Sequence, residues 1–330
     1  MLLIIIICGV GFGVITYSRF VLAEIYEYDA SFSNHAYLPR LEKPARIVAK
    51  GIYLTASTAA SESRRKAIIE LIESTELNAV VIDIKDYTGN ILYDSSLPLV
   101  DELDTDRDVL KNARTVIKDF KDHGIYVIAR QTVFQDPILA KSKPEWSIQN
   151  TGGGIWRDYK GLAWVDPTKH EVWNYNIAIA KEAVKLGFDE INFDYVRFPS
   201  DGNISIATYA NLTGTKTENM HEFFRTLAHE LRNEPAYTSV DLFGLVLEAH
   251  NFDLNIGQRL DAVVNTVDYI YPMTYPSHYP DGHLQFPNPA DYPYEVVKNG
   301  LDKARSVVVG TDTQLRPWLQ AFDLGAVYDE

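Results

Sequence analysis

The sequence has almost no cysteine: its single cysteine, Cys8, lies in an apolar run at the N-terminus. The rest of the chain therefore has no disulfide and no thiolate metal site. Eight histidines are present, but there is no HxH pair, and His229-Glu230 is not followed by the second histidine of an HExxH motif. These absences predict a protein that holds no metal and uses no cofactor.

The glycine and serine motifs of several large enzyme classes are also missing. No GxGxxG or GxxxxGKS/T motif follows an early strand-like segment, which disfavours an open nucleotide-binding sheet. No GxSxG elbow occurs, which disfavours a serine nucleophile. The three consecutive glycines at residues 152–154 are an isolated cluster, and they indicate a flexible loop.

Positive charge is scarce in this chain. It carries 31 lysines and arginines against 45 aspartates and glutamates, a formal net charge of −14. Because nucleic acids bind to basic surfaces that release their counterions, this balance argues against a nucleic-acid partner. Neutral or cationic partners suit the surface better.

A long apolar run occupies the N-terminus. Residues 1–17 carry no charge, and the run is slightly shorter than the roughly 20 residues of a comfortable membrane span. Small residues near Ala23 suit a signal peptidase, but no basic segment precedes the run, so a cleaved signal peptide and a retained anchor both remain open. We expect an extracytoplasmic protein, membrane-anchored or secreted, with residues 1–23 as signal or anchor, 24–45 as linker and 46–330 as the folded domain.

The rest of the chain predicts a parallel barrel. With 46% hydrophobic residues, it can bury the core of one barrel domain of roughly 250 residues. Short apolar segments alternate with amphipathic ones, which is typical of parallel β/α units. Expected strands cover residues 48–55, 79–86, 125–131, 187–200, 238–247, 268–273 and 316–322; expected helices cover residues 63–74, 106–123, 171–186, 219–233, 257–267 and 294–305. Seven such strands predict a (β/α)8 TIM barrel, and since only eight residues follow the seventh, we expect it to be truncated, without strand eight.

The stretch at residues 187–200, GFDEINFDYVRFPS, has the pattern of a strand that delivers a carboxylate to an active site. Asn192 and Asp194 share one face, while Ile191 and Phe193 face the opposite way. In a parallel barrel, polar residues near the C-terminal strand ends face the mouth, where active sites lie. Asp194 is therefore a candidate catalytic residue; its structural alternative is a cap or an ion pair with Arg197.

Carboxylates recur at the other predicted strand ends. Asp83 and Asp86 end the second strand, Asp241 lies in the fifth, and Glu248 follows one loop later. Paired carboxylates at a barrel mouth lined by aromatic residues suit glycosidic bond cleavage, in which one acid protonates the leaving oxygen and the other meets the oxocarbenium ion.

Six longer motifs carry a family resemblance: GFDEINFDYVRFPSDG, VVIDIKD, GGGIWRDYKGLAWVDP, SVDLFG, YPMTYPSHY and RPWLQAF. They extend from about residue 48 to residue 322, and they resemble a bacterial glycoside hydrolase family, formerly a domain of unknown function, whose members are often membrane-anchored. That family is distantly similar to the α-amylase-type barrels. The resemblance implies a TIM barrel that acts on carbohydrate.

The resemblance also implies roles for two residues. In α-amylase-type barrels the nucleophile is an aspartate that ends strand four, and the acid/base is a carboxylate that ends strand five. By strand position, Asp194 matches the nucleophile and Asp241 the acid/base, with Glu248 as the alternative acid/base. This sequence departs from the pattern at Asn192, where those enzymes usually have arginine, and in its missing eighth strand.

Other candidate residues have two open roles. Arg130 either pairs with Asp194 at the site or neutralises an acid inside the barrel. Asp83 and Lys85, predicted to share a face, are either a buried structural pair or substrate contacts. Tryptophans in the loop at residues 132–169 are either sugar platforms or loop anchors. The expected substrate-binding residues are Asp83, Lys85, Arg130, Trp156, Asn192, Arg197, Glu248, Tyr271, Met273, Tyr275, His278, Trp318 and Gln320.

The sequence thus predicts a glycoside hydrolase that cleaves a cell-surface or extracellular polysaccharide with Asp194 and Asp241. The alternative is a catalytically inactive barrel that binds glycan, and a transferase that uses the same carboxylates also remains open. The expected partners are the polysaccharide or oligosaccharide substrate and, through the N-terminal segment, a membrane.

Overall fold

The computed structural model describes residues 43–328. The predicted signal peptide or anchor and all but the last three residues of the predicted linker lie outside the described residues. Within residues 43–328, no helix combines the length and the apolar character that a membrane crossing requires.

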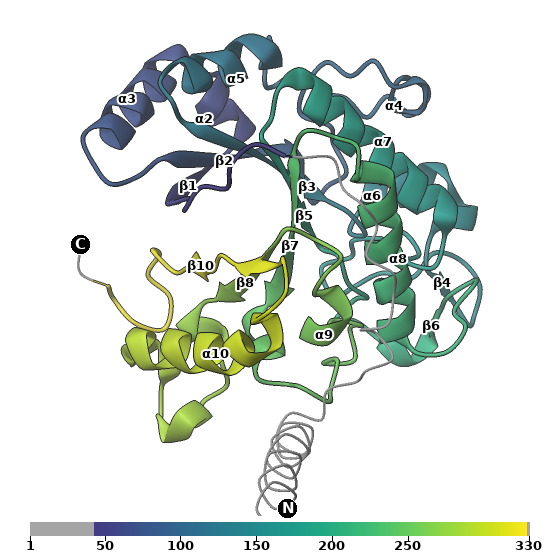
Figure 1. Ribbon diagram of the computed structural model, residues 1–330. Helices are drawn as coiled ribbons and strands as arrows, with labels where there is room; N and C mark the ends of the chain where they lie inside the picture. The colour runs from purple at the N-terminus through teal and green to yellow at the C-terminus, as the bar shows by residue number, and fades with distance from the viewer. Residues whose placement is uncertain (1–42, 329–330) are drawn as a thin grey trace, which may run out of the picture.

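One curved parallel sheet forms the centre of the fold (Figure 1). Its strands follow the order β1 (Gly51–Leu54), β2 (Ala79–Lys85), β3 (Tyr126–Thr132), β5 (Glu190–Asp194), β7 (Tyr237–Phe243), β8 (Tyr269–Thr274) and β10 (Trp318–Leu319), and the short β9 (Gln314–Leu315) also pairs with β8. They fill seven strand positions of a (β/α)8 barrel, and β1 and β10 do not pair with each other. The prediction of a TIM-barrel fold in which seven of the eight strand positions are filled is confirmed for the described residues.

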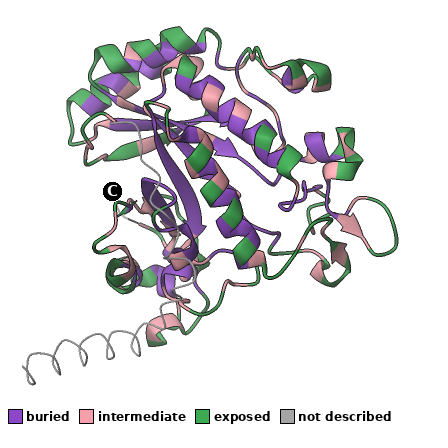
Figure 2. Cartoon of the chain, turned by 45° about the vertical axis from the view of Figure 1, so that its right-hand side comes forward, coloured by how far each residue is buried: buried purple, intermediate pink, exposed green. Residues whose placement is uncertain are grey.

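Helices follow the strands and cover the outer face of the sheet (Figures 1 and 2). They are α2 (Ala56–Ala60), α3 (Glu62–Glu73), α4 (Pro98–Leu103), α5 (Ala113–Asp122), α6 (Pro137–Ser142), α7 (His170–Leu186), α8 (Lys216–Leu231), α9 (Leu260–Val263) and α10 (Pro293–Val308). The 3-10 helices are η1 (Pro144–Trp146), η2 (Ile204–Ile206), η3 (Gly244–Leu247), η4 (Pro276–His278), η5 (His283–Gln285) and η6 (Pro289–Asp291). Figure 2 shows the central strands of the sheet buried, an edge strand partly exposed and the helices buried mainly on their sheet side.

The two faces of each strand enter different environments. On β2, Val80 and Ile82 belong to the core between sheet and helices. Val81 belongs to a smaller cluster inside the barrel, together with Ile128 of β3 and Tyr271 of β8. Because side chains alternate along a strand, the inward-facing set continues to Asp83 at the end of β2. The alternation therefore delivers polar residues to the barrel mouth.

Two expected helices are much shorter than the sequence pattern predicts. Residues 106–112 do not join α5, because the backbone of Arg107 and Leu110 bonds to Ile91 and Leu92 across the chain. The helix expected over residues 257–267 is reduced to α9, since Gly257 has a left-handed φ of 81°. In both cases local backbone conformation or pairing overrides the apolar spacing.

A small antiparallel pair ties two of the long loops together. β4 (Gln149–Asn150) lies in the loop between β3 and α7, and β6 (Ala207–Thr208) lies in the loop between β5 and α8. The pairing fixes these two strand-to-helix loops against each other beside α7 and α8 (Figure 1).

Candidate active site

One arginine joins three carboxylates at the C-terminal ends of neighbouring strands. Arg130 of β3 lies in register with Asp83 of β2, and its Nη1 is 2.8 Å from the Asp83 Oδ1. Its Nη2 donates to Asp194 Oδ2, and its Nε lies 3.7 Å from Asp241 Oδ2. We call these four residues the Arg130 cluster. Three strands thus converge on a single guanidinium, as the position of the carboxylates at strand ends predicts.

Asp241 is the deepest carboxyl of the Arg130 cluster. Its side chain is 1% exposed, against 7% for Asp194. Asn192 Nδ2 and Trp318 Nε1 each donate to its Oδ1 at 2.9 Å. Burial, reinforced by the negative charge of Asp194, raises the pKa of Asp241 to about 8, although Arg130 and the two donors oppose the shift. The surroundings of Asp241 therefore favour its protonated form more than those of an ordinary aspartate.

Asp194 has a different set of partners. Its Oδ2 accepts from Arg130, and its Oδ1 accepts from the backbone N–H of Tyr195 at 2.6 Å. Tyr195 adopts a left-handed φ of 53°, a conformation that costs free energy in a residue with a side chain. This turn ends β5 directly after Asp194 and points a backbone donor at its carboxylate.

Arg197 lies beside the Arg130 cluster within a group of aromatic rings. Its guanidinium carbon is 5.0 Å from the centre of the Trp164 ring and 4.7 Å from that of Phe243. It donates to the carbonyl of Phe198 and to Ser200 Oγ, so the cation paired with Asp194 is Arg130. The burial of Arg197 lowers its pKa.

Aromatic side chains lie near the cluster. The Tyr53 hydroxyl donates to Asp83, and the Arg130 guanidinium lies 5.7 Å from the Tyr53 ring centre. Burial and the negative charges of Asp241 and Asp194 raise the pKa of Tyr275. The Tyr275 ring centre is 5.5 Å from those of His278 and Phe322.

Lys85 lies away from the Arg130 cluster. The pairing of β2 with β3 shifts register between Asp83 and Lys85, so the expected shared face of these two residues is not observed. Lys85 Nζ is fully buried 2.8 Å from Asp136 Oδ2, and it donates to the Thr132 carbonyl and to Asn176 Oδ1. Its partners belong to β3, α7 and the loop after β3.

Glu248 forms a separate group with the last helix. Its Oε2 is 2.7 Å from Lys303 Nζ and from Asn299 Nδ2, and its Oε1 is 3.2 Å from His283 Nε2. These three partners all differ from those of Asp241, so the structure brings Asp241, and not Glu248, to Arg130.

The other expected residues are distributed around the barrel. Trp156 is buried, and its indole donates to the Asn203 carbonyl, which makes it an anchor between two loops. Gln320 Oε1 accepts from the Ser277 hydroxyl and backbone, so it holds the loop that follows β8. Met273 is half-buried and pairs in register with Trp318.

A second polar layer, which was not among the residues predicted from the sequence, lies deeper in the barrel. Glu190 is fully buried; it accepts from Tyr271 at 2.7 Å and from Tyr126 at 3.0 Å, and it is 2.8 Å from Arg316 Nη1. Counting by two from Asp194 through Asn192 reaches Glu190, so the same alternation would have found it. Among residues 43–328, no group of three histidines, cysteines or carboxylates is arranged to hold a metal ion.

Comparison with known proteins places the chain in a family. A family model described as "Putative glycosyl hydrolase domain" matches residues 51–330. A hypothetical protein from Ruminiclostridium thermocellum ATCC 27405 is 38% identical, with 58% of this chain and 96% of that chain covered and a TM-score of 0.54. The glycoside hydrolase domain of PgaB (BpsB) from Bordetella bronchiseptica is 13% identical, with 82% of this chain and 94% of that chain covered and a TM-score of 0.55, a likeness that concerns the fold alone.

No curated protein matches the chain. The family model nevertheless covers most of its length, including every strand of the sheet and all members of the Arg130 cluster. The chain therefore belongs to the family described as "Putative glycosyl hydrolase domain", and its enzyme class is that of the glycoside hydrolases, which act on carbohydrate.

Proposed function

We propose that the protein hydrolyses glycosidic bonds of a cell-surface or extracellular polysaccharide, with Asp194 and Asp241 as its catalytic pair. The observation that carries this proposal is the shared guanidinium of Arg130, which holds both carboxyl groups at one place and in different environments. When the surroundings of two titratable groups in one site give them different pKa values, one group can act as the acid and the other as the base.

The surroundings assign a role to each carboxyl group. Asp241, with a pKa raised to about 8, carries the proton that the leaving glycosidic oxygen receives. Asp194 accepts at both oxygens and presents its negative charge to the anomeric carbon as the oxocarbenium ion develops. Water then supplies the hydroxyl of the new reducing end, and its second proton returns to the carboxylate of Asp241.

Aromatic residues near the pair support a sugar as the substrate. Tyr53 is 45% exposed and donates to Asp83 of the Arg130 cluster, and the rings of Tyr275 and Phe322 lie 5.5 Å apart. Aromatic faces of this kind provide apolar contact for the C–H faces of a pyranose ring, while their hydroxyls provide hydrogen bonds.

Export of the enzyme is part of the proposal. The uncharged apolar run at residues 1–17 suits either a signal peptide or an anchor, and the absence of cysteine from the rest of the chain is compatible with any redox compartment. A polysaccharide substrate outside the cytoplasm follows from this location.

The test compares turnover by the wild type, Asp194→Asn, Asp241→Asn and Glu248→Gln on a glycan and on an activated aryl glycoside. Asp194→Asn should lower kcat by about a thousandfold, since it removes the charge that stabilises the transition state. Asp241→Asn should be severe on the glycan and milder on the aryl glycoside, whose leaving group needs no proton. Glu248→Gln, the alternative acid/base, should keep near-normal turnover on both.

Circular dichroism of each variant controls for folding. Near-normal turnover by a well-folded Asp194→Asn protein would end the assignment of this residue. A wild type that binds glycans but cleaves none of them would instead identify a carbohydrate-binding barrel.

A further inference from the structure

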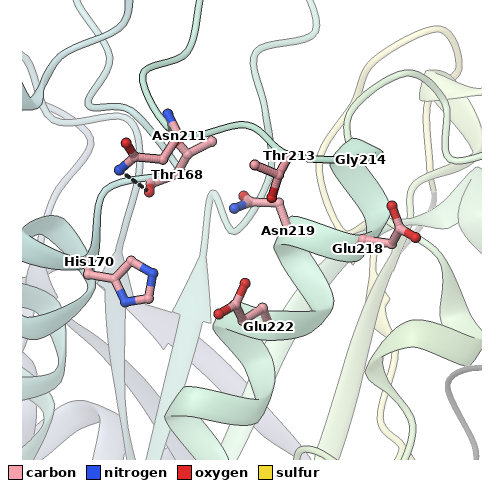
Figure 3. A pocket seen from close by; sticks show the side chains of 8 residues that line it. All are labelled: Thr168, His170, Asn211, Thr213, Gly214, Glu218, Asn219 and Glu222. Atoms are coloured by element: carbon pink, nitrogen blue, oxygen red, sulfur yellow. Dashed lines mark hydrogen bonds between the residues drawn. The ribbon is translucent and has the colours of Figure 1, made fainter.

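A hollow of about 590 Å³ lies on the outer side of the barrel, between the start of α7 and the first turns of α8 (Figure 3). Its lining is mostly polar, and it includes no member of the Arg130 cluster. The lining residues are Thr168, His170, Asn211, Thr213, Gly214, Glu218, Asn219 and Glu222.

Hydrogen bonds hold the walls of this hollow in place. Asp166, which is fully buried, accepts from the backbone of Thr168 at 2.9 Å and of Ala210 at 2.7 Å. Asn211 Nδ2 donates to the Thr168 carbonyl, the bond drawn in Figure 3. On the α8 side, Thr215 and Glu218 form a reciprocal capping box that fixes the first turn of the helix. The hollow is therefore built from segments that are ordered without a ligand.

Asn219 is the feature of this hollow that points to a ligand. The residue is only 8% exposed, and its Oδ1 is buried without a hydrogen-bond partner among the described residues. Figure 3 shows its side chain extending from α8 towards Thr168 and His170, into the hollow. A buried acceptor without a donor costs free energy, and a donor group in the hollow would remove that cost.

The charged residues that line the hollow indicate which donor groups a ligand would carry. Glu218 and Glu222 contribute two carboxylates, and the lining contains no lysine or arginine. The imidazole of His170, whose ring centre lies 4.1 Å from that of Trp173, forms the opposite wall. An acidic, acceptor-rich site disfavours anions and favours a ligand with N–H and O–H donors and a positive charge.

From these observations we infer that the hollow is a second binding site, which takes a protonated primary amine carried on a hydroxylated ring, that is, an amino sugar. Asn219 Oδ1 and the Glu222 carboxylate accept from the ammonium group, and the amide and hydroxyl groups of Asn211 and Thr213 bond to ring hydroxyls. The site is separate from Asp194 and Asp241, so it requires no turnover there.

Isothermal titration calorimetry of the full chain with glucosamine and with glucose tests this inference, because the two sugars differ in one amine. Glucosamine should bind with a Kd on the order of 1 mM, and glucose at least about tenfold more weakly, since a charge-assisted hydrogen bond is lost. Glucosamine binding should also weaken as salt rises, because the carboxylates are near the surface.

Two variants locate the binding. Glu222→Gln removes one exposed carboxylate and should weaken glucosamine binding roughly two- to fivefold, while turnover at the catalytic pair stays unchanged. Asn219→Ala should weaken it further, with the melting temperature as the control for folding. Glu70→Gln, which removes an exposed carboxylate from α3 on a distant part of the molecule, should leave binding unchanged (Figure 1).

Equal affinity for the two sugars, or glucosamine binding that is unaffected by Glu222→Gln, would overturn the inference. Since binding is measured without turnover, an inactive catalytic pair would leave this result standing, and the two proposals fail separately. If Asn219→Ala does not fold, the Glu222→Gln result decides alone, because Glu222 is an exposed residue.

Discussion

Arg130 compensates for only part of the negative charge that surrounds it. Three carboxyl groups lie against one guanidinium, and the side chains of Asp83, Asp194 and Asp241 are 10%, 7% and 1% exposed. Because burying an uncompensated charge is costly, a proton on the deepest of the three groups reduces the excess negative charge where its cost is highest. The same arrangement that makes the cluster compact therefore provides an acid.

The pH dependence of turnover should report this proton. If Asp241 is the general acid, its conjugate base is inactive, so kcat/KM on a glycan should fall as the pH rises above about 8. A pH profile of the wild type measures this limb. The same profile on an activated aryl glycoside should show a weaker alkaline fall, and an equally steep fall on both substrates would contradict the role of Asp241.

Through Asp241, the free energy of unfolding should fall as the pH rises. A carboxylate whose pKa is lowered by an ion pair has the opposite effect. The pKa of Asp241 is about 8 in the folded protein and near 3.8 in the unfolded chain, so between these values the folded state holds a proton that the unfolded state has lost. The contribution of Asp241 to stability is thus complete below pH 4 and is lost as the pH rises towards 8. Asparagine does not titrate, so the melting temperature of Asp241→Asn relative to the wild type should increase from pH 5 to pH 8. A difference that does not change with pH would show that Asp241 is ionised in the folded state.

At the scale of single residues, the alternation of side chains along a strand correctly predicted which residues share a face where the strand is regular. It put Asn192 and Asp194 on one face and brought Arg130 within reach of Asp194. Alternation could not show which carboxyl is deepest, because the indole of Trp318 comes from a segment 77 residues away from Asp241 along the chain. It also could not show that Arg130 contacts a third carboxylate, since that depends on side-chain reach across strands.

The end of β2 shows how one irregularity redirects a side chain. The register shift after Asp83 sends Lys85 away from the barrel interior and into contact with Asp136, the residue that caps α6. Both side chains are fully buried. A buried pair contributes little net stability, but the removal of one partner leaves a buried charge without compensation.

Lys85→Met should therefore destabilise the protein by about 3–5 kcal/mol at neutral pH. The control Lys66→Met removes an exposed lysine of α3 and should cost less than about 0.5 kcal/mol. The double variant Lys85→Met/Asp136→Asn should recover part of the loss, since asparagine keeps the α6 cap without the charge. Urea unfolding measures all three, and a Lys85→Met protein as stable as the wild type would show that water compensates Asp136.

Element boundaries were predictable where a helix is long and its ends carry clear signals. α7 and α8 lie within three residues of their expected starts, and Gly187, with a φ of 111°, ends α7 as its sequence predicts. The expected strand at residues 187–200 shortens to β5, because Tyr195 turns into the left-handed region. Such a conformation in a tyrosine has no sequence signal, since it is maintained by the hydrogen bonds around Asp194.

The whole molecule has polar groups at both ends of its barrel and through its interior. The Arg130 cluster lies at the C-terminal strand ends, and the layer of Glu190 and Arg316 lies below it. At the opposite end, Lys43 and Arg46 reach Asp268 at 2.8 and 3.5 Å, and the Tyr237 hydroxyl donates to the Pro44 carbonyl. Residues 43–46 are therefore part of the barrel structure and extend the folded unit to the end of the predicted linker.

This contact predicts where the chain can be shortened without loss of stability. A chain that begins at residue 43 keeps the pairs with Asp268, so it should melt at the same temperature as the full-length chain. A chain that begins at residue 47 leaves Asp268, whose side chain is 3% exposed, without either cation, and it should be destabilised by about 3 kcal/mol at neutral pH.

The comparison can be made by thermal unfolding at pH 7. The variant Lys43→Met in the chain that begins at residue 43 separates the lost charge from the lost segment. Equal melting temperatures for the two shortened chains would show that residues 43–46 rest on the barrel without stabilising it.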